Sequence, residues 1–175
     1  MHSEIATKKS RVYDGKVVKL DVDEVVLENG KFATREVVRH TGGAAVLAID
    51  DNQEMYLVRQ FRYPYGEEML EIPAGKLNEG EDPLSCAKRE LLEETGLIAE
   101  KWEFVGAFRP SPGYTDEKLY VYIAKELSEK EQNLDDDEFL DVVKMKAIKA
   151  MKMIEKGEIT DAKTVIAIYK YVTEM

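Results

Sequence analysis

The first third of the chain alternates apolar and polar residues in a pattern that predicts two antiparallel strands. Residues 17–27 and 32–38 alternate in this way, and Asn29-Gly30 between them is a strong signal for a tight hairpin turn. A hairpin of two strands is marginal by itself in water. We therefore expect this hairpin to pack against another surface, with its own chain among the candidates.

Further along, apolar runs bounded by turn residues predict four more strands. Residues 44–49 (AAVLAI) form a continuous apolar run typical of a buried central strand, and 55–60 follows after a polar turn. Two strands are expected at 102–108 and 118–124, on either side of the turn-rich segment PSPGYTDE at 110–117. We expect this segment to carry function, because binding residues are common on loops held by a rigid scaffold.

A helix is predicted over about Pro83–Thr95, with signals at both ends. Asp82 suits the N-cap, proline is favoured at the first helical position, and Gly96 suits the left-handed residue that ends a helix. The stripe expected to be buried consists of Leu84, Ala87 and Leu91.

Two helices are predicted near the C-terminus. After the acidic stretch 133–143, Ile148, Met151 and Ile154 recur at helical spacing up to Gly157. A second helix begins near Thr160 or Asp161, and its apolar side is expected to comprise Val165, Ile168, Tyr169 and Val172. Strands around one central helix, with trailing helices, indicate an α+β domain. We expect one domain over 1–175, with 1–40 as an N-terminal extension and 41–175 as the core.

Composition and charge narrow the class of protein. The chain has 44% hydrophobic and 34% charged residues, as soluble globular proteins do, and its formal net charge is -10. Such a charge opposes binding to nucleic acid or to anionic membranes. No apolar signal segment and no run of about 18 apolar residues is visible, so we expect a cytoplasmic protein. The single cysteine, Cys86, is expected to be a small core residue rather than a nucleophile.

The predicted helix at 83–95 carries the main chemical signal. Glu90, Glu93 and Glu94 share one surface, where we expect an exposed cluster of mutually repelling carboxylates. Arg89, four residues before Glu93, can offset one of them. A hard divalent cation, Mg²⁺ or Mn²⁺, would neutralise the others. The alternative is a solvated acidic face. The regular spacing of the whole segment, G-x5-E-x7-R-E-U-x-E-E-x-G-U with U apolar, from Gly75 to Leu97, favours the metal site.

This segment is identified as a Nudix box, and nearly the whole chain resembles bacterial ADP-ribose pyrophosphatases of the Nudix family. Pro112, fifteen residues beyond Leu97, is typical of that subgroup. The resemblance implies a Nudix fold: mixed β-sheets around a central catalytic loop and helix, with C-terminal helices and an N-terminal β-hairpin. The other matching segments are FATREVVRHTGGAAVLA (32–48), VRQFRYP (58–64), EIPAGKL (71–77), SPGYTDEKLY (111–120), DDDEFLDV (135–142) and DAKTVIAI (161–168).

The resemblance also implies a reaction, hydrolysis of ADP-ribose to AMP and ribose 5-phosphate, and a set of metal ligands. Two or three Mg²⁺ ions, with Mn²⁺ as the alternative, would bind Glu90, Glu94, the carbonyl of Ala74 and Glu93. Metal ions suit this chemistry because they neutralise a pyrophosphate, orient the attacking water and stabilise the leaving oxygen.

The catalytic and substrate-binding residues are implied position by position. Glu138 is the expected general base, with Asp137 and the metal-bound Glu93 as rivals, and a merely solvated acidic loop as the structural alternative. Arg89 belongs to the catalytic box. The expected substrate contacts are Arg62 at the phosphates, Arg35 near the adenine, and Glu71, Gly113 and Glu117 near the ribose and phosphate end. A strand arginine lying over the hairpin is an equal alternative for Arg35.

The resemblance implies a homodimer, no nucleic acid and no membrane. Two alternatives to ADP-ribose hydrolysis remain open. One is hydrolysis of another nucleoside diphosphate derivative, such as a sugar nucleotide or a dinucleotide. The other is a non-catalytic ADP-ribose sensing module, which the intact carboxylates of the box disfavour.

Overall fold

The computed structural model describes residues 2–134 and 139–174. The chain divides into two compact units. The first comprises Met1–Gly42 and Arg109–Lys118, and the second comprises Gly43–Phe108 and Leu119–Met175. The turn-rich segment at 110–117, which the sequence placed in the core part of the chain, thus belongs with the N-terminal strands.

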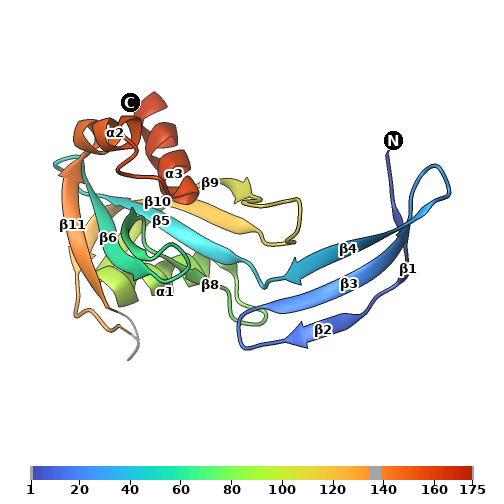
Figure 1. The fold of residues 1–175 in the computed structure, drawn as a ribbon. Coiled ribbons are helices and arrows are strands. Elements are labelled where there is room, and N and C mark those ends of the chain that lie inside the picture. The colour runs from blue at the N-terminus through green and yellow to red at the C-terminus, as the bar shows by residue number, and fades with distance from the viewer. Residues whose placement is uncertain (1, 135–138, 175) are drawn as a thin grey trace. The chain divides into compact units, whose positions relative to one another are not determined.

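The first unit is a four-stranded antiparallel sheet built around one long strand (Figure 1). β3 (Lys19–Val26) pairs along its length with β4 (Phe32–Arg39), which confirms the predicted hairpin. Gly30 adopts a φ of 76° in the turn, where glycine carries no steric cost. On its other side β3 pairs with two short strands, β1 (Ile5–Lys8) and β2 (Arg11–Asp14). The sequence analysis missed both, because their side chains are exposed and carry no apolar alternation.

The second unit contains a seven-stranded mixed sheet. Its main path runs β11-β6-β5-β10-β9, with β7 paired to β6 and β8 paired to β5. The central strand β5 pairs in parallel with β10 and is buried along its whole length, as the apolar run predicted. The strands are β5 (Gly43–Ile49), β6 (Glu54–Arg62), β7 (Glu67–Glu71), β8 (Ala74–Lys76), β9 (Leu97–Phe108), β10 (Leu119–Glu129) and β11 (Leu140–Lys146).

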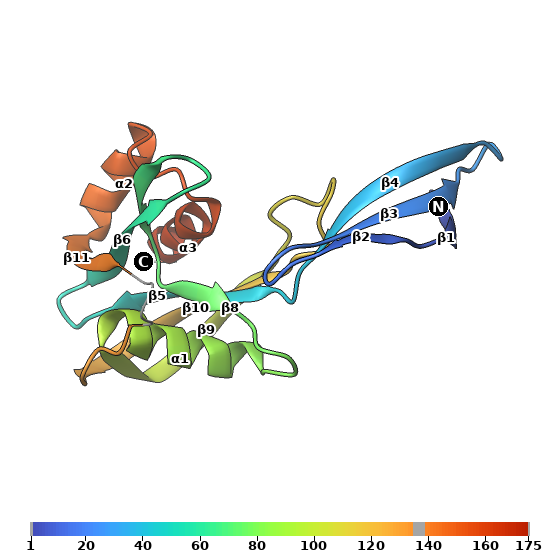
Figure 2. The same ribbon diagram turned by 60° about the horizontal axis from the view of Figure 1, so that its bottom comes forward.

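Helices cover both faces of this sheet. Figure 2 shows α1 (Pro83–Thr95) on one side of β5 and β10, and α2 (Ala147–Glu155) and α3 (Ala162–Thr173) on the other. Side chains alternate along β5 accordingly. Ala44, Val46 and Ala48 belong to the hydrophobic cluster of α1, whereas Ala45, Leu47 and Ile49 belong to the cluster of α3. The architecture confirms the predicted α+β class, and α1 is the layer that positions the candidate site.

The helix ends confirm the sequence signals for α1. The Asp82 side chain accepts a hydrogen bond from Ser85 N, and Gly96 takes a left-handed φ of 68°. Of the predicted stripe, Ala87 and Leu91 are fully buried and Leu84 packs at the edge of the same cluster.

The predicted apolar sides of the C-terminal helices need correction. Tyr169 is 41% exposed and Ile148 66% exposed, so neither faces the core. The predicted Ile168 is buried in α3, together with Thr164, Ala167 and Tyr171, and α2 buries Ala150. The other predicted residues are partly buried and pack against the same core: Met151, Ile154, Val165 and Val172. In α3 the stripe follows the i, i+3, i+4, i+7 spacing through small and polar residues, which a search for large apolar side chains overlooks.

Candidate active site

Two of the three clustered carboxylates of α1, Glu90 and Glu94, are buried, and Glu93 is partly exposed. Glu90 is 6% exposed and Glu94 2% exposed, whereas the sequence predicted an exposed cluster. α1 packs on β5 and β8, which pair with each other at Ala44 and Gly75. Glu90 lies against Gly75 of β8. Burying a carboxylate without compensation is costly, so the site needs nearby cations and hydrogen-bond donors.

Gly75 leaves the space that the carboxylate of Glu90 occupies. A β-carbon built on residue 75 would lie 1.9 Å from Oε1 and 2.4 Å from Oε2 of Glu90, closer than any side chain permits. Any side chain at the first position of the Gly75–Leu97 pattern would therefore displace the Glu90 carboxylate from this place against the backbone.

Arg89 is the cation within this cluster. Its Nη1 donates to Glu90 at 2.6 Å and to Glu93 at 2.9 Å, and its Nε donates to Glu81 at 3.0 Å. The sequence pattern predicted one carboxylate partner for Arg89, but Arg89 contacts three. The hydrogen bond from Arg89 lowers the pKa of Glu81, and Glu81 in turn is the main cause of the raised pKa of Arg89. Glu81, the first fixed glutamate of the pattern, thus anchors this arginine.

The donor set suits a hard divalent cation. Glu90, Glu93 and Glu94 offer carboxylate oxygens, and Ala74 lies beside them, since its N–H donates to Glu94 Oε2 at 3.2 Å. Within residues 2–134 and 139–174 no three acidic, histidine or cysteine side chains already converge as a metal site. Because Arg89 is bound to Glu90 and Glu93, a metal ion that takes these oxygens has to displace it.

A third buried glutamate, Glu71, pairs with Arg62, and both were predicted to contact substrate. Glu71 is 2% exposed, and Arg62 binds it through two hydrogen bonds, Nε to Oε1 at 2.6 Å and Nη2 to Oε2 at 2.7 Å. Lys163 of α3 also donates to Oε2. Burial alone would raise the pKa of Glu71, but Arg62 and Lys163 outweigh it, and the pKa is lowered. Both oxygens of Glu71 thus contact side chains of the protein itself.

Lys163 was missed by the sequence analysis. The segment DAKT gave only a helix start, but the structure shows that it ties α3 to the sheet. Asp161 caps α3 by accepting from Thr164 N at 3.0 Å and also contacts Lys163 at 2.9 Å. Thr164 Oγ1 accepts from Ile72 N at 2.8 Å, directly after β7. A lysine two residues after an N-cap aspartate, in the first turn of a largely apolar helix, was the available signal.

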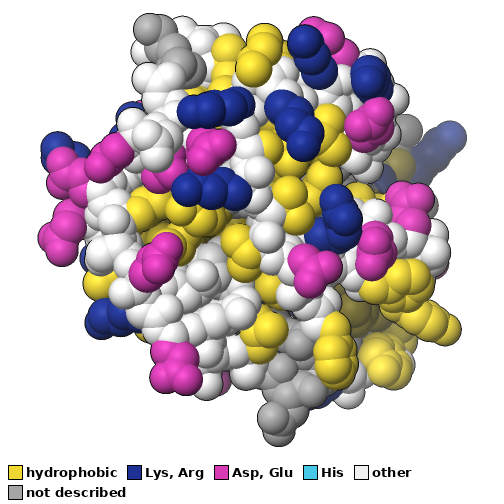
Figure 3. All heavy atoms as spheres, turned by 90° about the vertical axis from the view of Figure 1, so that its left-hand side faces the viewer, with side chains coloured by type: hydrophobic (Ala, Val, Ile, Leu, Met, Phe, Trp, Pro, Cys, Tyr) yellow, Lys and Arg dark blue, Asp and Glu magenta, His cyan; other side chains and the backbone are white. Residues whose placement is uncertain are grey.

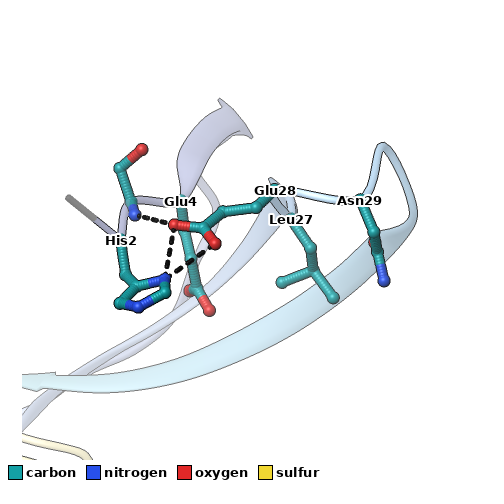
Figure 4. Close-up of a pocket in the computed structure, with 6 residues that line it drawn as sticks. His2, Glu4, Leu27, Glu28 and Asn29 are labelled. Carbon is teal, nitrogen blue, oxygen red and sulfur yellow. Dashed lines mark hydrogen bonds and ion pairs between the residues drawn. The ribbon is translucent and has the colours of Figure 1, made fainter.

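In the first unit, Arg35 is held by an acidic partner. Its Nε donates to Glu4 at 2.9 Å, and Glu4 lines a pocket of about 700 Å³ at the tip of the sheet (Figure 4). Figure 4 shows His2 pointing toward Glu28, at 2.8 Å from Oε2. Hydrogen bonds from His2 and from Ser3 N lower the pKa of Glu28. The bond to Glu4 fixes the partly exposed guanidinium of Arg35. The role of Arg35 near an adenine stays a prediction.

Two further predicted residues lie on the turn-rich segment of the first unit. A β-carbon on Gly113 would meet no atom within 4 Å, so its backbone is open to close approach. Glu117 Oε1 lies 3.7 Å from His40 Nδ1. Glu138 and its rival Asp137 lie outside the described residues.

Cys86 is fully buried in the cluster of α1, which confirms its prediction as a core residue. Burial, assisted by the charge of Glu90, raises the pKa of its thiol to about 12. The thiol is therefore protonated at neutral pH and is not a nucleophile.

The surface and the helices add two general findings. The face of the second unit drawn in Figure 3 interleaves Lys and Arg with Asp and Glu, with hydrophobic side chains between them. Among the described residues, no helix is both long and apolar enough to cross a membrane.

Comparison with known proteins matches this site to a family. Residues 39–166 match the model of the NUDIX domain. The chain is 46% identical over 162 residues to the ADP-ribose pyrophosphatase of Bacillus subtilis (strain 168), covering 91% of this chain and 88% of that protein. It is 45% identical over 170 residues to the methanol dehydrogenase activator of Bacillus methanolicus, covering 96% and 92%.

A solved structure described as an ADP compounds hydrolase superposes with a TM-score of 0.85, covering 97% of this chain and 92% of that one at 22% identity, which supports the fold. The box pattern, the glycine beneath Glu90 and these matches have one explanation: the chain belongs to the Nudix family.

Proposed function

We propose that the protein is a divalent-metal-dependent ADP-ribose pyrophosphatase that hydrolyses ADP-ribose to AMP and ribose 5-phosphate. The observation that carries the proposal is the pair of buried carboxylates, Glu90 against Gly75 and Glu94 at the N–H of Ala74, in a chain 46% identical to a named ADP-ribose pyrophosphatase. The hydrogen bond to Glu71 is the main cause of the raised pKa of Arg62, and the charge of nearby Glu94 raises it further. A phosphate-binding cation thus lies near the carboxylates.

Mg²⁺ is the proposed ion, with Mn²⁺ as the alternative and two or three ions in all. The residues that would hold them are Glu90, Glu93, Glu94 and the carbonyl of Ala74. Bound ions would neutralise the pyrophosphate and lower the pKa of the attacking water. Metal binding would require Arg89 to leave Glu90 and Glu93. Arg89 would then stay bound to Glu81 through the hydrogen bond that its Nε donates.

The remaining roles belong to the protein's own side chains. Arg62 offers the phosphates a guanidinium whose direction is fixed by Glu71, because two parallel hydrogen bonds define its plane. Gly113 and Glu117 are proposed at the ribose and phosphate end, and Arg35 at the adenine. Glu138 is the proposed general base, with Glu93 as its rival.

A cytoplasmic homodimer is proposed as the assembly. The sheet of the first unit exposes several large apolar side chains, among them Phe32 at 75% and Ile5 at 68%. Exposed apolar groups on one small sheet favour a partner surface, and a second copy of the chain supplies one. Size-exclusion chromatography with light scattering tests this, and a monomer at micromolar concentration contradicts it.

The function is tested with a substrate panel. ADP-ribose, a GDP-sugar and a dinucleotide are incubated with Mg²⁺ or Mn²⁺, and the products are separated by chromatography. AMP and ribose 5-phosphate from ADP-ribose, at the highest kcat/KM of the panel, are expected. If another member turns over and ADP-ribose does not, the alternative Nudix substrate is correct. If no member turns over with either ion, the sensing module is favoured.

Glu94→Gln is the control for this panel. It removes a charged oxygen from the proposed metal site while keeping the side-chain volume, so kcat should fall at least about 100-fold. The far-UV circular dichroism spectrum should be retained. A variant with a near-normal rate would remove Glu94 from the metal site.

A second candidate function follows from the relative in Bacillus methanolicus. Its name describes activation of methanol dehydrogenase, and the identity of 45% extends over 96% of this chain. The test adds the protein to a methanol dehydrogenase and measures alcohol oxidation. If the native protein increases the rate of alcohol oxidation and the Glu94→Gln variant does not, the activation depends on the same site.

A further inference from the structure

We propose that Asp116 is a positioning residue that fixes the loop 111–117 against the end of β4 and thereby sets the affinity for the ribose and phosphate end of the substrate. The inference rests on the proposed function for its substrate. Its structural part, the attachment of the loop, stands on contacts within the first unit alone.

The loop is attached to β4 by its backbone. Val38 N donates to Tyr114 O at 2.7 Å, and Asp116 N donates to Val38 O at 3.2 Å, which forms a parallel bridge between Val38 and Thr115. Ser111 O accepts from Thr115 N at 3.2 Å and closes the turn that presents Gly113. Two inter-segment backbone bonds alone hold a loop weakly, because a single bond contributes only about 1 kcal/mol net.

The side chain of Asp116 adds two charge-assisted bonds at the same place. Oδ1 accepts from His40 N at 3.0 Å, and Oδ2 accepts from Arg39 Nη1 at 3.2 Å. The carboxylate of Asp116 therefore accepts hydrogen bonds from two consecutive residues at the end of β4. Hydrogen bonds to a charged group are stronger than neutral ones, so this side chain contributes a large share of the attachment.

Arg39 is itself anchored in the centre of the sheet. Its Nε donates to Asp21 at 2.9 Å and its Nη2 to Asp23 at 3.2 Å, and both aspartates lie on β3 with less than 10% exposure. Each of the three guanidinium nitrogens thus contacts a different carboxylate. The rigid plane of the guanidinium holds these nitrogens in fixed directions, and it therefore links Asp116 to two aspartates of β3.

The consequence concerns Glu117, the next residue. His40 Nδ1 accepts a hydrogen bond from Gly42 N at 3.0 Å, so in this tautomer it has no proton to donate to Glu117. The backbone N–H of Glu117 donates to Thr115 Oγ1 at 3.2 Å, within the loop itself. The bonds of Asp116 to β4 therefore determine where Glu117 lies, as they do for Gly113.

The test is Asp116→Asn, with Asp116→Ala as the stronger variant. Asparagine keeps an acceptor for His40 N but loses the charge facing Arg39. KM for ADP-ribose should rise about tenfold while kcat stays within about twofold, because the loop binds substrate and touches no reacting bond. Asp116 is 45% exposed, so both variants should fold and melt close to the native temperature.

A structural readout accompanies the kinetics. In Asp116→Ala, amide exchange of Val38 and of residues 114–116 should accelerate about tenfold without substrate. The matched control is Asp14→Asn on β2, an exposed carboxylate 3.6 Å from Arg11 and 3.9 Å from Lys19. It removes the same charge from the same unit and should change neither KM nor exchange.

The outcomes separate this inference from the proposed function. If KM is unchanged in both Asp116 variants, the positioning role is wrong. This holds whether or not kcat falls and whether or not amide exchange accelerates. If the native protein hydrolyses another nucleotide instead of ADP-ribose, the proposed function fails and KM for that nucleotide decides. If it hydrolyses none, the Kd of ADP-ribose by calorimetry replaces KM.

Discussion

Glu90 of α1 and Gly75 of β8 are in direct contact, the carboxylate lying where a side chain on residue 75 would be. The contact joins the first position of the Nudix pattern to the helix that carries its carboxylates. The glycine admits the carboxylate to a buried position at the edge of the central sheet, and the helix holds it there.

Gly75→Ala should therefore damage the metal site. A methyl group 1.9 Å from Oε1 has to push Glu90 away, so divalent metal affinity and kcat should each fall by about 10- to 100-fold. Manganese binding followed by electron paramagnetic resonance measures the first, and ADP-ribose hydrolysis the second. Gly113→Ala makes the same chemical change in open space and should leave metal affinity unaltered. Equal metal affinity in both variants would contradict the assignment.

Lys163→Met should weaken substrate binding through Glu71. Without Lys163, the buried carboxylate keeps only Arg62, so Arg62 is less free to turn to a phosphate. We expect a higher KM and a loss of about 3 kcal/mol in the free energy of unfolding, as for other broken buried ion pairs. Lys170→Met on the same helix is the control. Lys170 forms a surface pair with Glu174, and its loss should cost less than about 0.5 kcal/mol. Urea denaturation distinguishes the two.

Chelation should abolish activity and leave the protein folded. Arg89 hydrogen-bonds to Glu81, Glu90 and Glu93 in the absence of metal and offsets part of the repulsion among these carboxylates. In Arg89→Gln this compensation is lost, and Mg²⁺ should raise the melting temperature about 3 °C more than in the native protein. Lys88→Gln on the same helix should behave as the native protein does. An equal effect of Mg²⁺ on all three proteins would show that Arg89 and metal do not share these oxygens.

The thiol of Cys86 should make stability fall at alkaline pH. Its pKa is about 12 in the folded protein and near the ordinary value, about 8.5, in the unfolded chain. Below that value both states hold the proton and stability is unaffected. Above it the unfolded chain releases a proton that the folded protein keeps, so unfolding becomes more favourable.

Between pH 8 and pH 10 the native protein should lose about 2 kcal/mol more in free energy of unfolding than Cys86→Ala does. Denaturant unfolding at both values measures the difference. A parallel decline in the two proteins would show that Cys86 holds no raised pKa.

The sequence predicted those parts of the fold whose signals are local. Asp82, Pro83 and Gly96 defined α1 to the residue, and Asn29-Gly30 located the β3–β4 hairpin, because caps and turns depend on neighbours in the chain. β7, β8 and β11 went unrecognised. β11 is an edge strand whose exposed positions carry charges such as Asp141, so its acidic composition resembled a loop.

The candidate site was predictable as a set of residues and not as an arrangement. Spacing on a helix placed Glu90, Glu93 and Glu94 together, but their burial depends on what the helix packs against, which periodicity does not encode. Likewise, nothing in the sequence places Lys163 within reach of Glu71, 92 positions earlier. Contacts of that kind follow from the packing of α3 on the sheet.

The chain enters the first unit twice, once at its start and again at 109–118. Deleting residues 1–42 would therefore remove β4 and leave the loop 111–117 without the strand to which it is bonded. The same two segments form a natural pair for exchange between related proteins. Moving 1–42 together with 109–118 transfers a loop with its matching edge, whereas moving either segment alone breaks the Asp116 contacts with Arg39 and His40.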